Sequence, residues 1–221
     1  MINKIVDSLS EAISDVQDGS TILIGGFGNS GIPNNLIAAV VAKDVKDLTI
    51  ITNNAGSGDS GVASLLKKRI VRKIVTSYPR SRGSIWFEEL YKSGEIELEL
   101  LPQGNLTEKV RAAGSGIGAF YTPIGVGTLL GKDKEQKMIN GKLHQLEYPL
   151  FADVALISAK TADRWGNLIY STTARNFGPS MAMAGKVTAV EVLNIVELGQ
   201  LDPEVIITPG IFVDKVVKVT R

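Results

Sequence analysis

The stretch DGSTILIGGFGNSGIPNNLI, residues 18–37, decides the fold class of this chain. Its apolar run TILI predicts a strand, and the glycines that follow predict a tight turn. The apolar spacing of Leu36, Ile37 and Val40 then predicts a helix that begins near Pro33. A strand, a glycine turn and a helix in this order are typical of α/β proteins with a parallel sheet.

The same alternation of strand and helix patterns continues on both sides of this stretch. In the first half it predicts helices over 3–16, 61–68 and 84–94, the last closed by Gly94, and strands over 21–26, 48–52, 71–78 and 96–102. The second half is richer in strands, with a hairpin over 136–148 turning at Asn140-Gly141 and strands over 153–159, 167–172, 186–192, 204–210 and 213–219. We therefore predict one α/β domain over residues 1–221, with an open, mostly parallel sheet flanked by helices and a strand-rich second half.

Composition excludes several classes of function. The 24 basic and 23 acidic side chains nearly cancel, so no basic excess is available to bind nucleic acid. The N-terminal residues lack the apolar segment of a signal peptide, and no run approaches the roughly 18 apolar residues that span a bilayer. Cysteine is absent and His144 is the single histidine, so we expect no metal site and no histidine-based triad. We expect a cytoplasmic protein that binds neither nucleic acid nor a membrane.

The glycine turn matches the dinucleotide-binding pattern G-x-G-x-x-G at residues 26–31, GFGNSG. An NAD site also needs an acidic residue at the carboxyl end of the next strand, where it binds the ribose hydroxyls. Here that strand is followed by Asn53 and Asn54, while Asp47 precedes it and Asp59 lies beyond the next turn. An NAD-dependent dehydrogenase is therefore the weaker alternative. We expect the loop and the following helix N-terminus to hold phosphate or another anionic or carbonyl group instead.

Neutral amides follow two further strands of the predicted sheet. Asn53 and Asn54 come after one strand, and Gln103 comes after another. Such amides can bind a carboxylate or a developing oxyanion, although Asn-Asn-Ala-Gly is equally consistent with simple turn chemistry. Asn105 and Glu108 have the spacing of a helix N-cap with an acidic third residue. The pattern indicates a pocket that binds and polarises, with the reacting group supplied from elsewhere.

Several long blocks of the chain resemble the α subunit, also called the A subunit, of family I CoA-transferases. The most specific block is DGSTILIGGFGNSGIP, and the others are NNAGSGD, PQGNLTEKVRAAGSGIGAFYTP, GVGTLL, DRWGNLIY and ARNFGP. The resemblance covers essentially the whole chain. It implies a fold like that of the CoA-transferases and ribose-phosphate isomerases, and an enzyme that moves coenzyme A between small carboxylic acids. It also implies a β-subunit partner, in an αβ or α2β2 assembly. A non-catalytic sensor on a related fold would normally add a DNA-binding segment, which is not evident here.

Within the family the chain is most similar to the branch that uses succinyl-CoA and 3-oxoadipate, through blocks such as FEELYKSGEIELELLPQGNL and FGPSMAMAGK. The acetoacetate or acetate type is the alternative, and Arg82 and Gly83 fit neither pattern. The family resemblance implies ping-pong catalysis by a glutamate in a Ser-Glu-Asn-Gly motif of the β subunit. No glutamate here precedes Asn-Gly, so we expect no catalytic nucleophile in this chain. The resemblance further implies that Asn53, Asn54 and Gln103 bind the acyl carboxylate, and that coenzyme A is bound by Gly25, Gly26, Phe27, Gly28, Asn29, Ser30 and Gly31.

Overall fold

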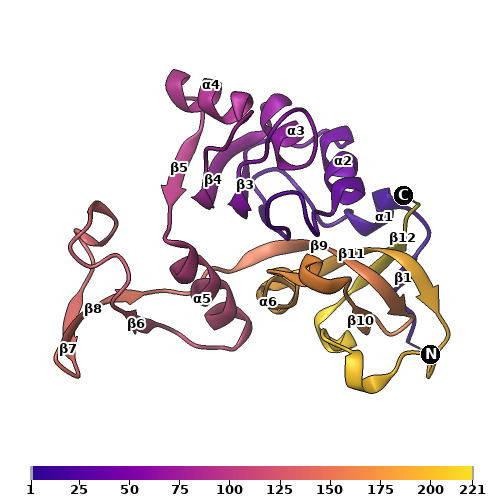
Figure 1. Ribbon diagram of the computed structural model, residues 1–221. Coiled ribbons are helices and arrows are strands. Elements are labelled where there is room, and N and C mark those ends of the chain that lie inside the picture. The colour runs from indigo at the N-terminus through magenta and orange to yellow at the C-terminus, as the bar shows by residue number, and fades with distance from the viewer. Residues whose placement is uncertain (1, 221) are drawn as a thin grey trace.

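Within residues 2–220, which this computed structural model describes, nine strands form one sheet (Figure 1). Eight of them lie in the order β1-β12-β11-β9-β2-β3-β4-β5 and every neighbouring pair is parallel, while β10 pairs antiparallel with β9. The predicted fold class is confirmed. The strands are β1 Ile5–Val6, β2 Thr21–Ile24, β3 Leu48–Asn54, β4 Val71–Tyr78, β5 Glu97–Leu100, β9 Ala152–Asp163, β10 Leu168–Ile169, β11 Gly185–Val196 and β12 Lys215–Lys218.

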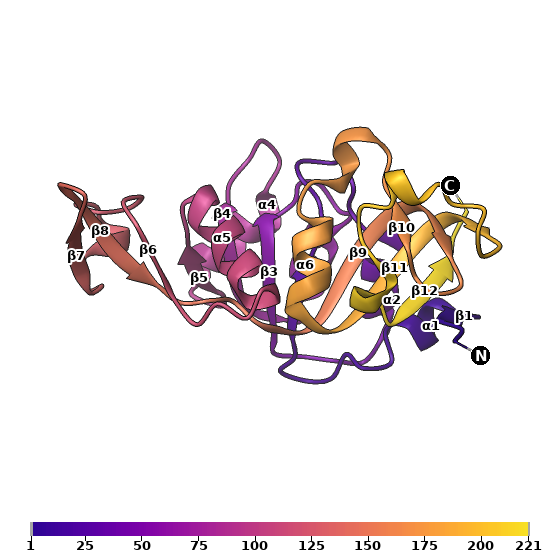
Figure 2. The same cartoon turned by 90° about the horizontal axis from the view of Figure 1, so that it is seen from below.

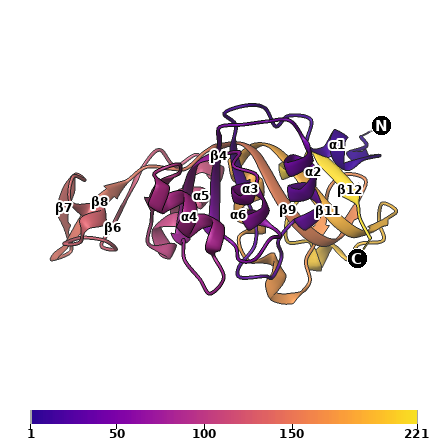
Figure 3. The same cartoon turned by 90° about the horizontal axis from the view of Figure 1, so that it is seen from above.

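Helices cover both faces of this sheet (Figures 1 and 3). Successive side chains of a strand point to opposite faces, so Ile22 and Ile24 of β2 enter one core while Leu23 enters the other. Strands buried on both faces are rich in apolar residues, which explains the run of Ile22, Leu23 and Ile24 in β2. On one face lie α1 Leu9–Ala12, α2 Asn34–Ala42, α3 Val62–Lys67 and α4 Ile85–Ser93, and on the other lie α5 Gln103–Gly114 and α6 Gly178–Ala184. One-turn 3-10 helices are η1 Leu129–Gly131, η2 Thr172–Arg175, η3 Pro203–Val205 and η4 Gly210–Phe212.

A small antiparallel sheet projects from the main body beyond α5 (Figure 2). It contains β6 Phe120–Thr122, β7 Gln136–Ile139 and β8 Lys142–Glu147 in the order β6-β8-β7. We call residues 120–147 the lobe. The predicted hairpin is confirmed, because β7 and β8 turn at Asn140 and Gly141 with φ angles of 48° and 74°.

The position of β2 explains where a ligand site can form. The chain runs outward from β2 through β3, β4 and β5, and later returns to β9, which pairs with the opposite edge of β2. The direction of winding therefore reverses between β2 and β9. Open parallel sheets bind ligands outside the carboxyl ends of their strands at such a switch point. The glycine loop that follows β2 lies at this place.

The predicted helix over residues 3–16 is wrong except for the single turn of α1, Leu9–Ala12, which ends at the cap residue Ile13. Ile5 pairs with Val216 in the parallel β1–β12 ladder, and the Lys4 ammonium donates to the carbonyl oxygens of Gly210 and Val213. A helix begins only at Leu9, after Ser8 caps it with its hydroxyl. The apolar spacing is compatible with a helix, but pairing with the far end of the chain overrides this local preference.

Two further predictions require correction. The segment 204–210 forms no strand beyond a single bridge between Thr208 and Leu168, because it begins in a 3-10 helix opened by Pro203. Asn105 is not a helix cap, since α5 already begins at Gln103 after Pro102. Asn105 instead lies buried inside α5 and donates to Glu147 of the lobe, while Glu108 pairs with Arg111.

Candidate functional site

The glycine loop, residues 25–31, forms a tight turn between β2 and α2. Phe27 and Ser30 exchange two backbone hydrogen bonds of 3.0 Å, and Gly28 between them has a φ angle of 58°. Gly31 has a φ angle of 71°, and a Cβ atom there would clash with the carbonyl oxygen of Ala174. Both glycines occupy the left-handed region that other residues rarely adopt. The tight turn predicted from the sequence is confirmed.

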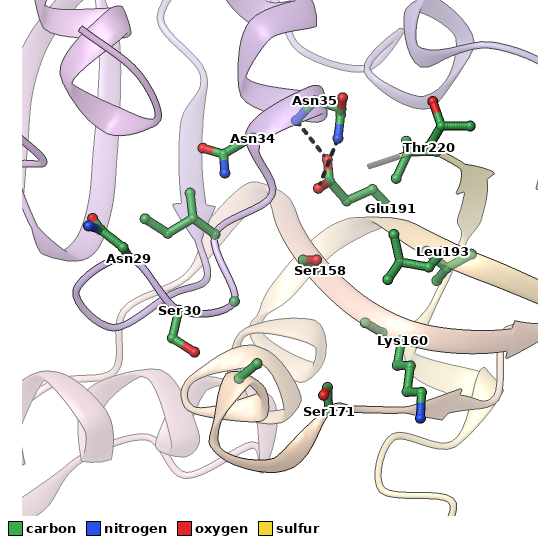
Figure 4. Close-up of a pocket in the computed structure, with 16 residues that line it drawn as sticks. Asn29, Ser30, Asn34, Asn35, Ser158, Lys160, Ser171, Glu191, Leu193 and Thr220 are labelled. Carbon is green, nitrogen blue, oxygen red and sulfur yellow. Dashed lines mark hydrogen bonds between the residues drawn. The ribbon is translucent and has the colours of Figure 1, made fainter. Parts of the chain in front are cut away.

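The N-terminus of α2, where we expected a bound anion, already holds a carboxylate of this chain. The N–H groups of Asn35 and Leu36 both donate to the Oε2 atom of Glu191 at 2.9 Å. Figure 4 shows the hydrogen bonds between Asn35 and Glu191. Glu191 projects from β11 and is 5% exposed. Burial raises the pKa of its carboxyl group and outweighs the helix N–H bonds that lower it. Glu191 therefore caps the N-terminus of α2, which offers little to a second anion.

A cavity of about 500 Å³ opens at the carboxyl ends of β3 and β4, beside the glycine loop. We call it the neutral cavity, because none of its lining side chains carries a charge at neutral pH. It brings together six of the ten predicted site residues from three separate segments. The predicted lining residues are Phe27, Gly28, Asn29, Asn53, Asn54 and Gln103, and the additional ones are Ser57, Ser77, Tyr78 and Ser81.

The two asparagines after β3 have different roles in the structure. The amide of Gln103 donates to the Oδ1 atom of Asn53 at 2.7 Å, and Asn53 is only 3% exposed. Asn54 instead accepts from the N–H group of Gly56 at 3.0 Å, which is the turn chemistry that the sequence left open. Asn53 and Gln103, 50 positions apart in the chain, thus form one amide pair in the cavity.

Several polar groups at this cavity have unused hydrogen-bonding capacity. Within residues 2–220, the N–H groups of Gly28 and Asn29 have no hydrogen-bond acceptor. The hydroxyl oxygen of Ser77 is buried and likewise has no partner in this part of the chain. Neutral donors of this kind can bind a carboxylate or an oxyanion, but cannot supply a carboxylate nucleophile or a strong base.

The remaining predicted loop residues lie elsewhere. Gly25 donates to the carbonyl oxygen of Leu156, and Gly26 donates to Asn176. Ser30 and Gly31 line a second cavity of about 530 Å³, which we call the Glu191 cavity (Figure 4). Asn29 lines both cavities, so the glycine loop forms the wall between them. The loop is predicted as one binding segment, but its residues face different surroundings.

Sequence reasoning missed several residues of the site. Ser77 and Tyr78 end β4, and the same strand-end reasoning that selected Asn53 could have selected them. Ser57 and Ser81 lie in the turns that follow these strands. Asn176 contacts the glycine loop from the other half of the chain, and nothing in the local pattern indicates this contact.

Comparison with known proteins fits this geometry. The sequence model described as Coenzyme A transferase matches residues 6–219. The chain belongs to the coenzyme A transferase family. It is 56% identical over 220 residues to the A subunit of 3-oxoadipate CoA-transferase from Pseudomonas putida, covering 100% of this chain and 95% of that protein. It is 46% identical over 216 residues to the A subunit of a probable succinyl-CoA:3-ketoacid coenzyme A transferase from Bacillus subtilis, covering 98% and 90%.

A solved structure shares the fold. An acyl-CoA transferase from Escherichia coli O157:H7, crystallised as a thioester complex with CoA, matches 99% of this chain with a TM-score of 0.84 and 22% identity. The family member described here spans about half of that longer chain, 47% of its length. In residues 2–220 no helix is both long and apolar enough to cross a membrane. The same residues hold no group of three or more His, Cys, Asp or Glu side chains arranged to share a metal ion.

Proposed function

We propose that this chain is the A subunit of a CoA-transferase that moves coenzyme A from succinyl-CoA to a 3-oxo acid, namely 3-oxoadipate. The observation that carries the proposal is the neutral cavity, with the glycine loop on one side and the Asn53–Gln103 pair on the other. Such a cavity suits a substrate that brings its own carboxylate and a carbonyl group. The 56% identity to the A subunit of a 3-oxoadipate CoA-transferase supports the choice of acceptor.

The reaction divides into two exchanges because a free carboxylate is a poor electrophile. A glutamate of the partner chain attacks the thioester carbonyl of succinyl-CoA, the C–S bond breaks, and its electrons leave on sulfur as the CoA thiolate. The thiolate then attacks the glutamyl carbonyl of the resulting anhydride, which releases succinate and leaves CoA as a thioester on the glutamate. The carboxylate of 3-oxoadipate runs the same two steps in reverse, so the kinetics are ping-pong.

This chain supplies binding and charge stabilisation. The N–H groups of Gly28 and Asn29 are available for the oxyanion that forms when the carbonyl is attacked. One such donor is worth about 3 kcal/mol of the activation barrier. Asn53 and Gln103 hold the carboxylate of the acyl group through uncharged amide donors. An amide carries no charge, so this carboxylate keeps its negative charge in the complex.

The nucleophile comes from a β subunit. None of the residues that line the neutral cavity is an acid, and its serines have no histidine or lysine among the lining residues to activate them. Phe27 and Tyr78 stand at the cavity with 52% and 60% of their surfaces exposed, which leaves apolar area for a partner to cover. The partner carries the glutamate of a Ser-Glu-Asn-Gly motif, and the assembly is αβ or α2β2.

An acetoacetate-type transferase is the second candidate, supported by the 46% identity to the Bacillus subtilis protein. A CoA-exchange assay with succinyl-CoA separates the two. The assay offers 3-oxoadipate or acetoacetate to this chain alone and to its complex with a partner that carries the motif. We expect exchange only in the complex, with the higher kcat/KM for 3-oxoadipate. A preference for acetoacetate would overturn the acceptor, and full activity of this chain alone would overturn the division of labour.

A further inference from the structure

Asn176 contacts the glycine loop at both ends of its turn. Its Oδ1 atom accepts from the N–H group of Gly26 at 3.0 Å, and its Nδ2 atom donates to the carbonyl oxygen of Ser30 at 3.0 Å. The same amide accepts from Phe177 at 2.7 Å and donates to Ala174 at 3.0 Å. All four hydrogen-bonding positions of one side chain are used, two on the loop and two on its own segment.

The backbone of Asn176 is held in an unusual conformation. Its φ and ψ angles are 23° and −110°, outside the regions that residues with a side chain normally occupy. Such strain persists only where surrounding contacts fix it, and it concentrates at functional sites. Gly31 lies so close to this segment that any side chain there would clash with Ala174. The two segments therefore fit each other tightly.

The segment around Asn176 also leads to the opposite wall of the neutral cavity. Phe177 is buried and directly precedes α6. Helix α6 packs closely on α5, since a Cβ atom on Gly114 of α5 would clash with Met183 of α6. Gln103 is the first residue of α5 and lines the neutral cavity. A continuous path of packed elements thus joins the glycine loop to Gln103.

We propose that Asn176 is a positioning residue, which fixes the glycine loop relative to the Asn53–Gln103 pair during CoA transfer. This inference rests on the proposed function, because it assigns the loop a role in that reaction. The amide keeps Gly26 and Ser30 in place, so the Gly28 and Asn29 N–H groups between them keep a fixed arrangement. Stabilisation of an oxyanion depends on donors that are already in place before the charge develops.

The test compares three variants in the assembled complex. Asn176→Ala removes all four hydrogen bonds, and we expect kcat to fall about 10- to 100-fold while the KM for succinyl-CoA changes little. Asn176→Asp keeps both acceptor functions but loses both donors when ionised. Its protonated form regains one donor, so the kcat of Asn176→Asp relative to the wild type rises as the pH is lowered. Asn176→Gly relieves the backbone strain without restoring the contacts, and its kcat stays low.

Asn167 offers a matched control. Its amide also bridges two distant segments, donating to Asp163 at 2.8 Å and accepting from Gly210 at 2.8 Å, but away from the glycine loop. We expect Asn167→Ala to lower the melting temperature and to leave kcat within about threefold of the wild type. The positioning role would be overturned if Asn167→Ala and Asn176→Ala lost the same fraction of kcat and if each loss of kcat tracked the fall in melting temperature.

Hydrogen–deuterium exchange separates this inference from the proposed function. In the chain without a partner, we expect Asn176→Ala to speed exchange in a peptide that contains residues 25–31, because the Gly26 N–H group loses its acceptor. An inactive wild-type complex would count against the proposed function. An active wild type with an equally active Asn176→Ala variant, or unchanged exchange in the loop, would count against the role of Asn176 alone.

Discussion

The neutral cavity and the base of the lobe both gather polar groups, but they use them in opposite ways. At the base of the lobe, Glu147 is 1% exposed and accepts hydrogen bonds from Lys109, Lys134, Asn105 and Gln145. These bonds join helix α5 to strand β8. We call these five residues the Glu147 cluster. In the neutral cavity the polar groups are uncharged, and several of them have no partner in residues 2–220.

The difference separates polar groups that support the fold from polar groups that are available to a ligand. A buried charge is tolerated only when its hydrogen bonds are satisfied, which the Glu147 cluster achieves for its carboxylate. The Gly28 and Asn29 N–H groups belong to exposed residues, so they are available to a ligand that brings an acceptor. The Oε1 atom of Gln145 in the Glu147 cluster also lacks a partner within residues 2–220. Unused capacity therefore supports the proposed role of the neutral cavity only together with the position of that cavity at the carboxyl ends of the strands.

Breaking the Glu147 cluster should give the largest loss of stability. Glu147→Gln leaves the ammonium group of Lys109, itself buried, without its carboxylate at 3.0 Å. We expect the free energy of unfolding in urea to fall by about 3–5 kcal/mol. Lys186→Gln, which breaks the exposed pair with Asp153, should change it by less than about 1 kcal/mol. Similar small losses in both variants would show that the cluster is no more structural than a surface pair.

The glycine loop should be the next most sensitive region. Gly31→Ala adds a methyl group against the carbonyl oxygen of Ala174 at a φ angle of 71°. Strain and overpacking together should cost about 2–5 kcal/mol of unfolding free energy. Gly28→Ala has a similar φ angle, 58°, but open space around the new methyl group, so only about 1–2 kcal/mol should be lost. Equal losses at the two positions would rule out close packing between the loop and the segment of Asn176.

Gln103 tests whether the unused capacity of the neutral cavity serves catalysis. Gln103→Ala removes one member of the amide pair with little effect on the fold, because Gln103 is exposed. In the assembled enzyme we expect kcat/KM for the acyl acceptor to fall about 10- to 100-fold, or about 1.4–2.7 kcal/mol. Gln136→Ala in the exposed part of the lobe is the control and should leave kcat/KM unchanged. Unaltered turnover and substrate affinity in Gln103→Ala would remove this residue from the site.

The pH dependence of stability should distinguish the two buried glutamates, with the smallest effect of the series. Burial raises the pKa of the Glu191 carboxyl group in the folded protein above its ordinary value of 4.5. The contribution of this group to the stability of the fold is therefore complete below the ordinary pKa, and it is lost as the pH rises through the higher folded-state pKa. The stability of Glu191→Gln relative to the wild type should therefore increase from about pH 4.5 to pH 7 in urea unfolding. A difference that stays flat across this range would show that Glu191 titrates normally.

Glu147 should show the opposite sign. Burial alone would raise its pKa, but the hydrogen bonds from Lys134 and Lys109 outweigh burial and hold the pKa below 4.5. Its contribution to stability is therefore complete above the ordinary pKa and is lost as the pH falls through the lower folded-state value. The stability difference between the wild type and Glu147→Gln should shrink in acid, below about pH 4.5. A difference that grows there would contradict the ion-pair assignment.

Local patterns predicted those parts of the fold that local chemistry fixes. Gly94 closes α4 with a left-handed φ angle of 74°, and the Asn140-Gly141 turn follows from the same preference. The strand ends also located Asn53 and Gln103, because parallel strands place their carboxyl ends along one edge. What failed depends on partners far away in the sequence. Ile5 joins Val216 in a sheet, and Asn105 is buried in α5 by its contact with Glu147.

The site shows the same limit. The sequence identified the glycine loop but not its division between two cavities, which depends on Glu191 and Asn176 from the second half of the chain. The anion expected at the start of α2 turned out to be the carboxylate of Glu191, about 155 positions away. A glycine motif alone therefore indicates that a turn is tight, and the neighbouring segments decide what it binds.

The most direct test of the central claim is to find which of the two chains becomes covalently attached to CoA. The purified complex is incubated with succinyl-CoA without an acceptor, denatured in acid, and the intact mass of each chain is measured. We expect the partner to gain the mass of CoA less one water as a glutamyl thioester, while this chain keeps the mass calculated from its sequence. CoA attached to a glutamate of this chain would contradict the conclusion that its cavity binds and polarises the substrate without supplying the nucleophile.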